Sequence, residues 1–448
     1  MPRLFLGNFE FEHRLADASR QLPAKLQRIN AELVTSWLAV AEDGDYLWTP
    51  QEIPKEFFEQ AVRDGLPRVI PVTGWEAAPI GVTCVPWGWT DDIRRLCDQY
   101  GWNRNDPPAD AVRAANSRRF SAALELEWQC GLDFAGAATS LAEIERLASF
   151  HGDSARWVIK AEFGMSGRER LIGAGAPTVT DRNWIERRLK SDGVVFYEPW
   201  IERVEEAGIQ IHIPREGVPE LIGVVPMFVN HQGQYAGSQF QAAESTASAR
   251  WDTAVEFALR AAVRIQQLGY WGPLGIDAMR YQDGKAIRCR PLQDINARWT
   301  MGRLSLGFRR LLPTNICGYW LHGPVAADSE SGTITLPLLR EFLRERGLRL
   351  SPDREILART ILGSTMPFTP EALEAVLSKS LICSRSTIYR TLQYLLDAAL
   401  ITEVTDDTGD TSYSCGRSFQ RRFASSAATI GGTPARHQSA VWGESSLS

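Results

Sequence analysis

Asp294-Ile-Asn296-Ala-Arg298 places a carboxylate, an amide and a guanidinium at alternate positions of one short segment. Because successive side chains of a β-strand point to opposite faces, these three groups would share one face of an extended strand. Carboxylate and carbonyl oxygens are the ligands that Mg²⁺ prefers, and an arginine beside them can hold an anionic group against the metal. The segment therefore predicts a magnesium site with a neighbouring anion clamp. The alternative is a surface strand that carries the pattern by chance.

The same segment closes a hairpin-like stretch that begins at Gly272 and whose first strand carries a further carboxylate, Asp277. The interval from Asp277 to Asp294 is longer than the mirror spacing of a tight hairpin, which would set Asp277 opposite Arg290. A bulge at residues 291–293 would bring the two aspartates together. We therefore predict Asp277 as a further metal ligand, with a structural acid as the alternative.

Composition sets broad limits on the function. The chain has 448 residues, of which 44% are hydrophobic and 23% charged, and a formal net charge of −5. These values are typical of a soluble globular protein with roughly two or three domains, and the net charge provides no global field for nucleic acid or anionic membrane. The seven cysteines form no C-x-x-C pair, which favours reduced thiols in the cytoplasm. We expect a cytoplasmic protein without a membrane partner, because no apolar run is long enough to span a bilayer.

Lys160 ends the apolar run Arg156-Trp-Val-Ile, and a loop with Gly164-x-x-Gly167 follows it. A lysine at a strand end can neutralise phosphate, and backbone N–H groups approach phosphate closely where glycines lack side chains. The loop is not a Walker loop, because no Gly-Lys-Ser/Thr follows, and Gly173-Ala-Gly175 lacks the third glycine of a dinucleotide fingerprint. The pattern predicts a phosphate site; an ordinary glycine-containing loop is the alternative.

A hinge-like segment, Glu198-Pro-Trp200-Ile201, comes next, and Glu206 lies shortly after it. The order of lysine strand, glycine loop, Glu-x-x-aliphatic hinge, acidic residue and carboxylate-x-Asn-x-Arg resembles the ATP-grasp family over about residues 1–320. In that family the hinge between two lobes holds adenine. The resemblance therefore implies that Glu198 and the backbone near Trp200 and Ile201 face the base of ATP.

The ribose and phosphate contacts are implied by the same resemblance. Glu206 would take the ribose hydroxyls, with Glu202 and Glu205 as rivals, and Lys160 would hold the α and β phosphates beside the glycine loop. Asn116-Ser-Arg118 resembles the family's Asn-x-Lys segment, so Arg118 would also meet phosphate, with its neighbour Arg119 as the rival. Arginine keeps the charge of lysine but changes the geometry of the contact.

The resemblance also implies the metal site and the chemistry. The ligands of Mg²⁺ or Mn²⁺ would be Asp277, Asp294 and Asn296. The family usually has glutamate where this chain has the shorter Asp294. Arg298 would be the catalytic residue that stabilises an acylphosphate. The implied reaction joins a small-molecule or peptide carboxylate to an amine or a thiol at the expense of ATP, in a pocket shaped by the first ~110 residues. His212 alternates within an apolar strand, which favours a core histidine over a catalytic base.

Residues 337–415 read as short helices followed by two strands. In the last helix, apolar side chains repeat at helical spacing and form one buried stripe: Ile388, Leu392, Leu395, Leu396 and Ala399. The polar side chains that fall towards the other side are Arg385, Tyr389, Arg390 and Gln393. A helix with an exposed basic and aromatic face, followed by two strands around an acidic turn, indicates a helix-turn-helix with a wing.

This segment, above all Ser384-x-Ser-Thr387-Ile-Tyr389-Arg390, resembles the DNA-binding half of the ferric uptake regulator family. The resemblance implies that Arg385, Thr387, Tyr389 and Arg390 approach DNA. The family's histidine- and cysteine-rich metal and dimerisation half does not follow, since only Cys415 and His437 remain after residue 400. Paired half-sites supply much of operator binding, so protein contact or a gene-fusion relic stands as the alternative to a DNA partner.

We therefore predict a mixed α/β (α+β) protein: an α/β domain (1–110), an ATP-grasp domain (111–321), a linker (322–336), a winged helix (337–415) and a disordered tail (416–448) that is rich in Ser, Ala, Gly and Thr. The predicted function is an ATP- and magnesium-dependent carboxylate ligase. The alternative is a nucleotide-sensing, DNA-binding transcriptional regulator without ligase activity. The enzyme is favoured, because a mere sensor would not need the arginine clamp of Arg298 beside the metal ligands.

Overall fold

The computed structural model describes most of the first 311 residues and scattered parts of the rest: 1–19, 23–150, 155–164, 169–229, 235–241, 246–311, 316–323, 339, 342–344, 346–348, 354, 357–358, 361, 369, 385–398, 400–405, 411–414, 421–423 and 437–444. The chain divides into two compact units. Unit 1 comprises Met1–Phe240, Glu244–Leu311 and Ser425–Gly432, and unit 2 comprises Gln241–Ala243, Leu312–Ala424 and Thr433–Ser448. Both helices and sheets are present, so the predicted mixed α/β class is confirmed.

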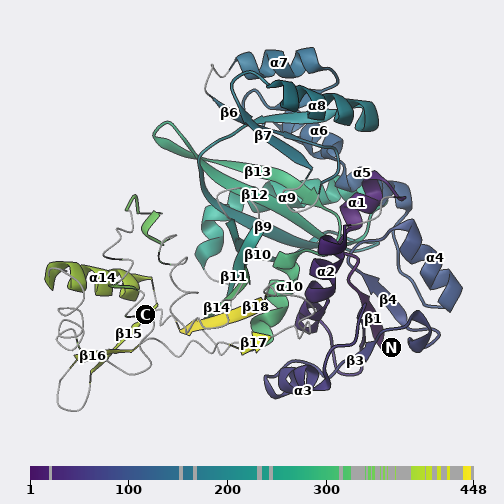
Figure 1. Ribbon diagram of the computed structural model, residues 1–448, viewed down its shortest axis with the longest axis vertical. Coiled ribbons are helices and arrows are strands. Elements are labelled where there is room, and N and C mark those ends of the chain that lie inside the picture. The colour runs from purple at the N-terminus through teal and green to yellow at the C-terminus, as the bar shows by residue number, and fades with distance from the viewer. Residues whose placement is uncertain are drawn as a thin grey trace. The chain divides into compact units, whose positions relative to one another are not determined.

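The N-terminal part of unit 1 is a parallel sheet with helices beside it (Figure 1). Its strands, in the spatial order β3–β2–β1–β4, are β3 (Ile70–Val72), β2 (Tyr46–Trp48), β1 (Arg3–Leu6) and β4 (Thr83–Pro86). The helices are α1 (Phe11–Ala16), α2 (Ala24–Leu33), η1 (Val34–Ala39), α3 (Lys55–Arg63), η2 (Trp75–Ala77) and α4 (Asp91–Tyr100). Parallel neighbours need long crossovers, and the helical segments between the strands supply them.

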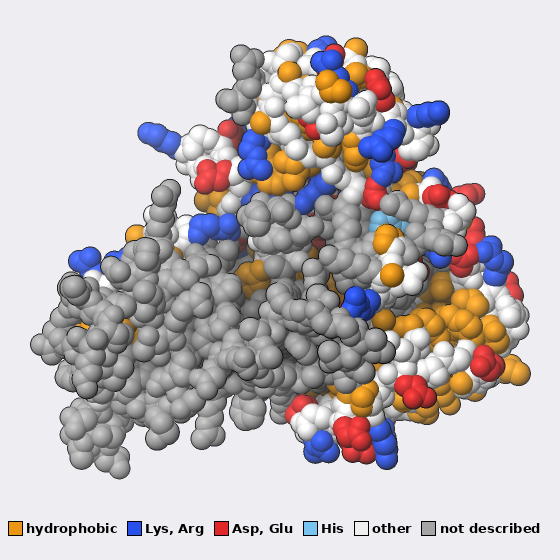
Figure 2. Space-filling view, in the orientation of Figure 1, with side chains coloured by type: hydrophobic (Ala, Val, Ile, Leu, Met, Phe, Trp, Pro, Cys, Tyr) orange, Lys and Arg blue, Asp and Glu red, His pale blue; other side chains and the backbone are white. Residues whose placement is uncertain are grey.

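A second sheet of four strands is antiparallel and has the order β5–β8–β6–β7. Its strands are β5 (Gly136–Ala138), β8 (Val195–Pro199), β6 (Arg156–Lys160) and β7 (Arg170–Ala174), and its helices are α5 (Ala109–Asn116), α6 (Arg118–Trp128), α7 (Leu141–Ser149) and α8 (Val179–Asp192). Ser140 and Glu143 form a capping box at the start of α7. On the face drawn in Figure 2, lysine and arginine side chains gather over this part.

The third sheet of unit 1 carries the hairpin predicted from the sequence. Five of its strands run in the order β13–β12–β9–β10–β11, namely β13 (Ala286–Asn296), β12 (Gly272–Asp283), β9 (Arg203–Ile213), β10 (Glu220–Val229) and β11 (Tyr235–Gln241). The helices of this part are η3 (Thr246–Trp251), α9 (Asp252–Gln267), α10 (Met301–Gly307) and η4 (Phe308–Leu311), and α9 packs against β9 and β13.

A bulge in β13 sets the register of this hairpin. Met279 is paired with Arg290, whereas Asp277 is paired with Asp294, so β13 has two more residues than β12 between these pairs. The predicted bulge at residues 291–293 is therefore confirmed, and Arg290 lies opposite Met279 instead of Asp277. Pro291 suits such a position, because proline cannot donate a hydrogen bond to the ladder.

In unit 2, α14 (Arg385–Asp397) is followed by the antiparallel pair β15 (Thr402–Thr405) and β16 (Thr411–Ser414), which matches the order of elements predicted for a winged helix. Strand β14 (Ile316–Gly323) pairs with β18 (His437–Glu444), which also pairs with β17 (Arg421–Phe423). The predicted linker overlaps β14 at His322 and Gly323, and its other residues lie outside the described ones. Strands β17 and β18 lie within residues 416–448, and the other residues of that segment lie outside the described ones.

Among the helices in the described ranges, none combines the length and apolar character that a bilayer crossing requires.

Candidate functional site

The predicted metal ligands meet where β12 and β13 run side by side. Asp277 is directly opposite Asp294, and Asn296 Nδ2 donates to Asp277 Oδ2 at 3.4 Å. Burial raises the pKa of Asp277 to about 7, and the nearby carboxylates of Asp294 and Glu206 add to this rise. Two carboxylates and one amide thus face each other without a full set of neutralising partners.

This donor set fits a hard divalent cation. No three His, Cys, Asp or Glu side chains converge in a metal-holding group anywhere in the described part of the chain. Magnesium, however, takes only one or two carboxylates from a protein and completes its shell with water and substrate phosphate. The carboxylates of Asp277 and Asp294 and the Oδ1 atom of Asn296 meet that requirement, and a cation between the carboxylates would relieve their mutual repulsion.

Arg298 lies beside this group and is held from three directions. Its Nη2 donates to Asn296 Oδ1 at 2.9 Å, its Nη1 donates to the backbone oxygen of Trp299 at 2.7 Å, and its Nε donates to a carboxylate oxygen of Glu12. Glu12 lies on α1, in the N-terminal part of unit 1, and is buried. No motif in the sequence marks Glu12 as a partner of Arg298. An anion that reaches Arg298 must share the guanidinium with this carboxylate.

Arg118 ties the helix start of α6 to the metal ligands. Its Nη2 donates to Asp294 Oδ2 at 3.1 Å, and its Nη1 donates to the backbone oxygen of Ala161 at 2.9 Å. Its rival Arg119 turns to Glu162 and to the backbone oxygen of Asp192. Of the two arginines, Arg118 is therefore the one beside the candidate site.

Asn116, two residues before Arg118, fixes the end of the segment that carries Asp294 and Asn296. Its Oδ1 accepts a hydrogen bond from the backbone nitrogen of Ala297 at 2.9 Å, and its Nδ2 donates to the backbone oxygen of the same residue at 3.3 Å. The Asn-x-Arg and Asp-x-Asn-x-Arg segments, distant in sequence, therefore form one structure.

Lys160 belongs to a buried network of charges. Its Nζ lies 2.9 Å from Glu198 Oε1 and 2.8 Å from Glu198 Oε2. Arg290 donates to Glu198 at 2.9 and 3.1 Å and to Glu125 at 2.6 and 2.9 Å. Burial by itself would raise the pKa of Glu198, but Arg290 and Lys160 hold it well below its usual range. The network fixes the position of the lysine at the end of β6.

Glu125 and Arg290 were not assigned a role from the sequence. A carboxylate on the buried side of α6 and an arginine beside the bulge in β13 are the signals that could have found them. Their presence changes the expectation for Glu198, because its carboxylate is occupied by two cations. What Glu198 offers to a base is its backbone at the end of β8.

Trp200 and Ile201 form the second half of the predicted hinge, after Glu198. The ring of Trp200 is flanked by the guanidinium groups of Arg156 and Arg203, each 4.7 Å from the ring centroid. The backbone nitrogen of Trp200 donates to the oxygen of Arg156 at 2.9 Å, and Ile201 follows it without strand structure.

Of the three acids proposed for the ribose, Glu202 is exposed and Glu205 is half-buried. Glu206 is buried on β9, and burial raises its pKa. Its Oε1 lies 3.2 Å from Arg203 Nε but accepts no hydrogen bond from a described residue. Glu205 is instead paired with Arg250 and Arg280. A buried acceptor without a donor is the kind of atom that a ligand hydroxyl satisfies.

The glycine loop is described only in part. Gly164 lies four residues after the end of β6, and Gly167 lies outside the described residues.

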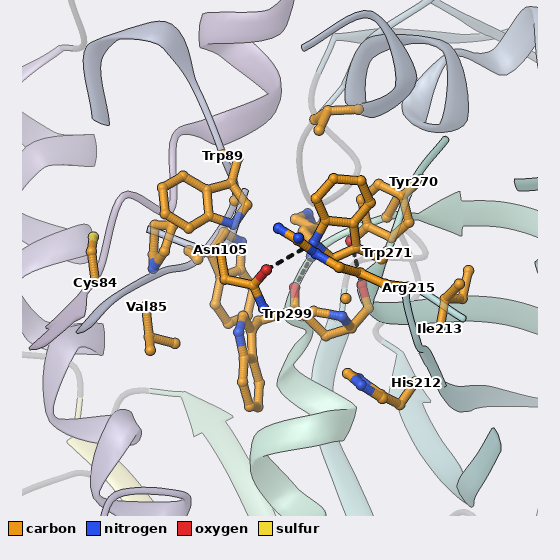
Figure 3. A pocket seen from close by; sticks show the side chains of 18 of the residues that line it. Cys84, Val85, Trp89, Asn105, His212, Ile213, Arg215, Tyr270, Trp271 and Trp299 are labelled. Atoms are coloured by element: carbon orange, nitrogen blue, oxygen red, sulfur yellow. Dashed lines mark hydrogen bonds between the residues drawn. The ribbon is translucent and has the colours of Figure 1, made fainter. Parts of the chain in front are cut away.

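A cavity of about 250 Å³ adjoins Arg298 (Figure 3). Its lining comes from residues 83–89, Asn105 and Val112, and from residues 212–215, 270–273 and 297–299 at the ends of β9, β12 and β13. His212 is half-buried and lines this cavity, so the expectation of a core histidine is wrong; burial lowers its pKa.

Comparison with known proteins gives a partial match in sequence. No family model matches the chain. An 83-residue stretch is 31% identical to the ferric uptake regulation protein of Campylobacter upsaliensis and covers 18% of this chain and 53% of that protein. The chain thus spans about half the length of the curated relatives it matches.

Among solved structures, the chain is similar to a biotin carboxylase–β-γ-ATP complex from Campylobacter jejuni (12% identity, 74% of this chain and 77% of that one, TM-score 0.43). It is also similar to a putative ATP-grasp superfamily protein from Archaeoglobus fulgidus (13% identity, 73% and 95%, TM-score 0.40). The residue roles proposed below rest on the contacts described above and not on these likenesses.

Proposed function

We propose that this chain is an ATP- and magnesium-dependent ligase that joins a carboxylate to an amine or a thiol through an acylphosphate. The observation that carries the proposal is the contact group of Asp277, Asp294, Asn296 and Arg298, which Arg118 joins through its hydrogen bond to Asp294. Two carboxylates, an amide and two guanidinium groups in one place suit the handling of a metal-bound phosphate chain.

The nucleotide would lie between the hinge and the metal ligands. Lys160 and Arg118 would bind phosphate, with Gly164 and Gly167 allowing the loop backbone to approach. The backbone from Glu198 to Ile201 would contact adenine, and Glu206 would accept hydrogen bonds from the ribose. The buried Oε1 atom of Glu206 and the fixed ammonium group of Lys160 support this orientation.

The reaction then follows from charge and position. A carboxylate oxygen of the substrate attacks the γ-phosphorus, and ADP leaves. The amine or thiol next attacks the acyl carbon, and inorganic phosphate leaves. When bound, Mg²⁺ would neutralise the charge that develops on the phosphate oxygens. Arg298 would stabilise the acylphosphate by charge-assisted hydrogen bonding.

The direct test is ADP release by the full chain with MgATP and a panel of carboxylates, each with and without an amine or thiol acceptor. We expect ADP release that depends on the presence of a carboxylate. ATP binding without such release, together with DNA binding that responds to ATP, would favour the alternative regulator.

The cysteines support a cytoplasmic location for the protein. The described ones, Cys84, Cys97, Cys130 and Cys289, are free thiols, as is usual in a reducing compartment.

The first prediction concerns Lys160. Its replacement by alanine should weaken ATP binding by ~1–3 kcal/mol, the range for losing a charged hydrogen-bond partner. Calorimetric titration with ATP measures the difference. Lys190→Ala is the matched control, because Lys190 is exposed on α8. Equal affinities of Lys160→Ala and Lys190→Ala for ATP would show that Lys160 has a structural role and does not bind phosphate.

A second candidate function, contact with DNA, is favoured by the exposed face of α14. Tyr389 is 43% exposed and Arg390 is also exposed, while Ile388, Leu392 and Leu395 are buried. Arg385 begins α14 and Thr387 is half-buried on it; the side chain of Arg385 lies outside the described ones. We propose that this face meets the phosphate backbone of duplex DNA weakly, because a single module lacks a second half-site.

The second prediction tests this contact in the full chain. Arg390→Ala should weaken binding to duplex DNA at ~50 mM salt and reduce the salt slope by about 1, as expected for one lost phosphate contact. Arg288→Ala removes an exposed arginine in unit 1 and serves as the control. Absence of DNA binding by the unmodified chain at this salt concentration would instead favour a protein-contact module.

A further inference from the structure

The cavity beside Arg298 has aromatic walls. Five of the residues that line it are Trp87, Trp89, Tyr270, Trp271 and Trp299. Figure 3 shows that their rings come from two sides, with Trp89 from the segment after β4 and with Tyr270 and Trp271 from the segment before β12. We call this space the aromatic cavity. Its walls offer flat apolar faces that suit a planar ring.

The polar atoms of two of these rings are already engaged. Trp271 Nε1 donates to Asn105 Oδ1 at 3.2 Å, and the Tyr270 hydroxyl donates to the backbone oxygen of Pro273 at 2.6 Å. Tyr270 is 3% exposed, whereas Trp271 is half-buried and Arg215 lies over its ring, so a ligand would meet the ring face of Trp271 that Arg215 leaves open. A ligand is recognised here by stacking and by shape, more than by hydrogen bonds to these two side chains.

The walls are also supported from behind. Trp299 packs edge-on against the buried Trp37 with ring centroids 5.2 Å apart, and Trp37 in turn packs edge-on against Trp87 at 6.0 Å. The backbone nitrogen of Trp299 donates to the backbone oxygen of Trp87 at 3.1 Å. A cavity held in this way is preformed, which limits the entropy lost when a ligand binds.

The charges of the lining favour an anion. Its charged residues are Arg298 and Arg215, and the described lining contains no aspartate or glutamate. Arg298 connects the cavity to Asn296 and so to the candidate metal ligands. Arg215 is exposed and lies over the ring of Trp271, 4.3 Å from its centroid. A carboxylate at the side of the cavity nearest the candidate metal ligands would meet the guanidinium group of Arg298 and share it with Glu12.

The size of the cavity limits the ligand. Its volume of about 250 Å³ lies below the roughly 300–1,000 Å³ of pockets that hold drug-sized molecules. The space suits one or two fused rings with a short acidic side chain, and it excludes a peptide of several residues from the cavity itself.

From these observations we infer that the carboxylate substrate is a small aromatic or heteroaromatic acid. Its ring lies among the tryptophan rings of the aromatic cavity, and its carboxylate faces Arg298. That this carboxylate is converted to an acylphosphate rests on the ligase proposal above, whereas recognition of the ring requires only the aromatic cavity.

The test is calorimetric titration of the full chain, without nucleotide, with three probes. Indole-3-acetate has both a ring and a carboxylate, octanoate has a carboxylate without a ring, and indole-3-acetamide has a ring without the charge. Indole-3-acetate should bind about tenfold more tightly than octanoate, because stacking of a ring on an aromatic side chain is worth about that factor. It should also bind about tenfold more tightly than indole-3-acetamide, because the amide lacks the charge that strengthens a hydrogen bond to a guanidinium group.

Variants of one wall residue locate the binding. Trp271→Ala should weaken the binding of indole-3-acetate about tenfold, and Trp271→Phe should largely restore it because the ring is kept. Trp128→Ala is the matched control, since Trp128 also lies beneath an arginine, with Arg260 4.5 Å from its ring centroid, but lies outside the cavity. It should leave the binding of indole-3-acetate unchanged.

The outcomes separate the two proposals. Octanoate that binds as tightly as indole-3-acetate, or indole-3-acetate binding that survives Trp271→Ala, would overturn the aromatic substrate. If octanoate but not indole-3-acetate stimulates ADP release, the ligase proposal stands without the aromatic substrate. If indole-3-acetate binds as expected but MgATP does not bind at all, the ligase proposal fails and the aromatic cavity stands as a binding site.

Discussion

Replacing Arg290 with alanine should lower the free energy of unfolding of unit 1 by roughly 3–5 kcal/mol, the range for removing one partner of a buried ion pair. The side chain of Arg290 is 4% exposed, and it donates two hydrogen bonds to Glu125 and two to Glu198. Alanine would remove all four and leave two buried carboxylates with Lys160 as their remaining cation in the network. Urea unfolding of the full chain, followed by tryptophan fluorescence, measures the loss.

Arg288→Ala is the matched control for this measurement. Arg288 lies two residues earlier on β13 and pairs with Asp283 at 2.7 Å, but the two side chains are 58% and 46% exposed. Exposed ion pairs contribute only about 0–1 kcal/mol, so this variant should unfold close to the unmodified chain. Similar unfolding midpoints for Arg290→Ala and Arg288→Ala would contradict the account of the buried network.

Several features of the hairpin could be predicted because they depend on local sequence. The alternation of Asp294 and Asn296 gives one strand face, whereas the predicted extension of that strand to Arg298 is wrong because β13 ends at Asn296. Counting residues across the hairpin shows that a bulge is needed to pair Asp277 with Asp294. The register confirms both the bulge and the pairing. The capping box at Ser140 also depends on local sequence, since its two partners are three residues apart.

The partners of these residues could not be predicted, because they come from distant parts of the chain. Glu12 reaches Arg298 from α1, and Glu125 reaches Arg290 from α6. Neither carboxylate lies in a motif, and only the packing of separate sheets brings it to its arginine. The ion pairs of Glu198 could not be predicted for the same reason. Its position in the hinge follows from the local sequence, whereas Arg290 and Lys160, which pair with its carboxylate, come from other strands.

The aromatic cavity could not be predicted from the sequence for a similar reason. Its tryptophans are spread over residues 87–299, and dispersed tryptophans in a sequence read equally well as core residues. The end of β4 in one sheet and the ends of β9, β12 and β13 in another must meet before Trp89 and Trp271 become two walls of one space. His212 was assigned to the core because alternation along a strand specifies a face of the sheet, but not whether that face ends at a cavity.

The proposed ligase depends most directly on Asp294 and Asn296. Asp294→Asn removes the negative charge that a metal requires, and Asn296→Ala removes an amide that contacts both Asp277 and Arg298. Each change should lower Mg²⁺-dependent turnover by roughly 100-fold or more, as expected when an electrostatic contact to developing charge is lost. The fold should persist, because both residues are only half-buried at the end of β13.

The decisive measurement is therefore the rate of Mg²⁺-dependent ADP release in the presence of a carboxylate substrate, compared between the unmodified chain, Asp294→Asn and Asn296→Ala. Asp283→Asn, an exposed aspartate of the same hairpin, controls for the loss of a negative charge. The account predicts that Asp283→Asn keeps the rate of the unmodified chain while the other two variants fall to background with unchanged circular dichroism. Rates equal to that of the unmodified chain in both site variants would contradict the metal site and, with it, the proposed ligase.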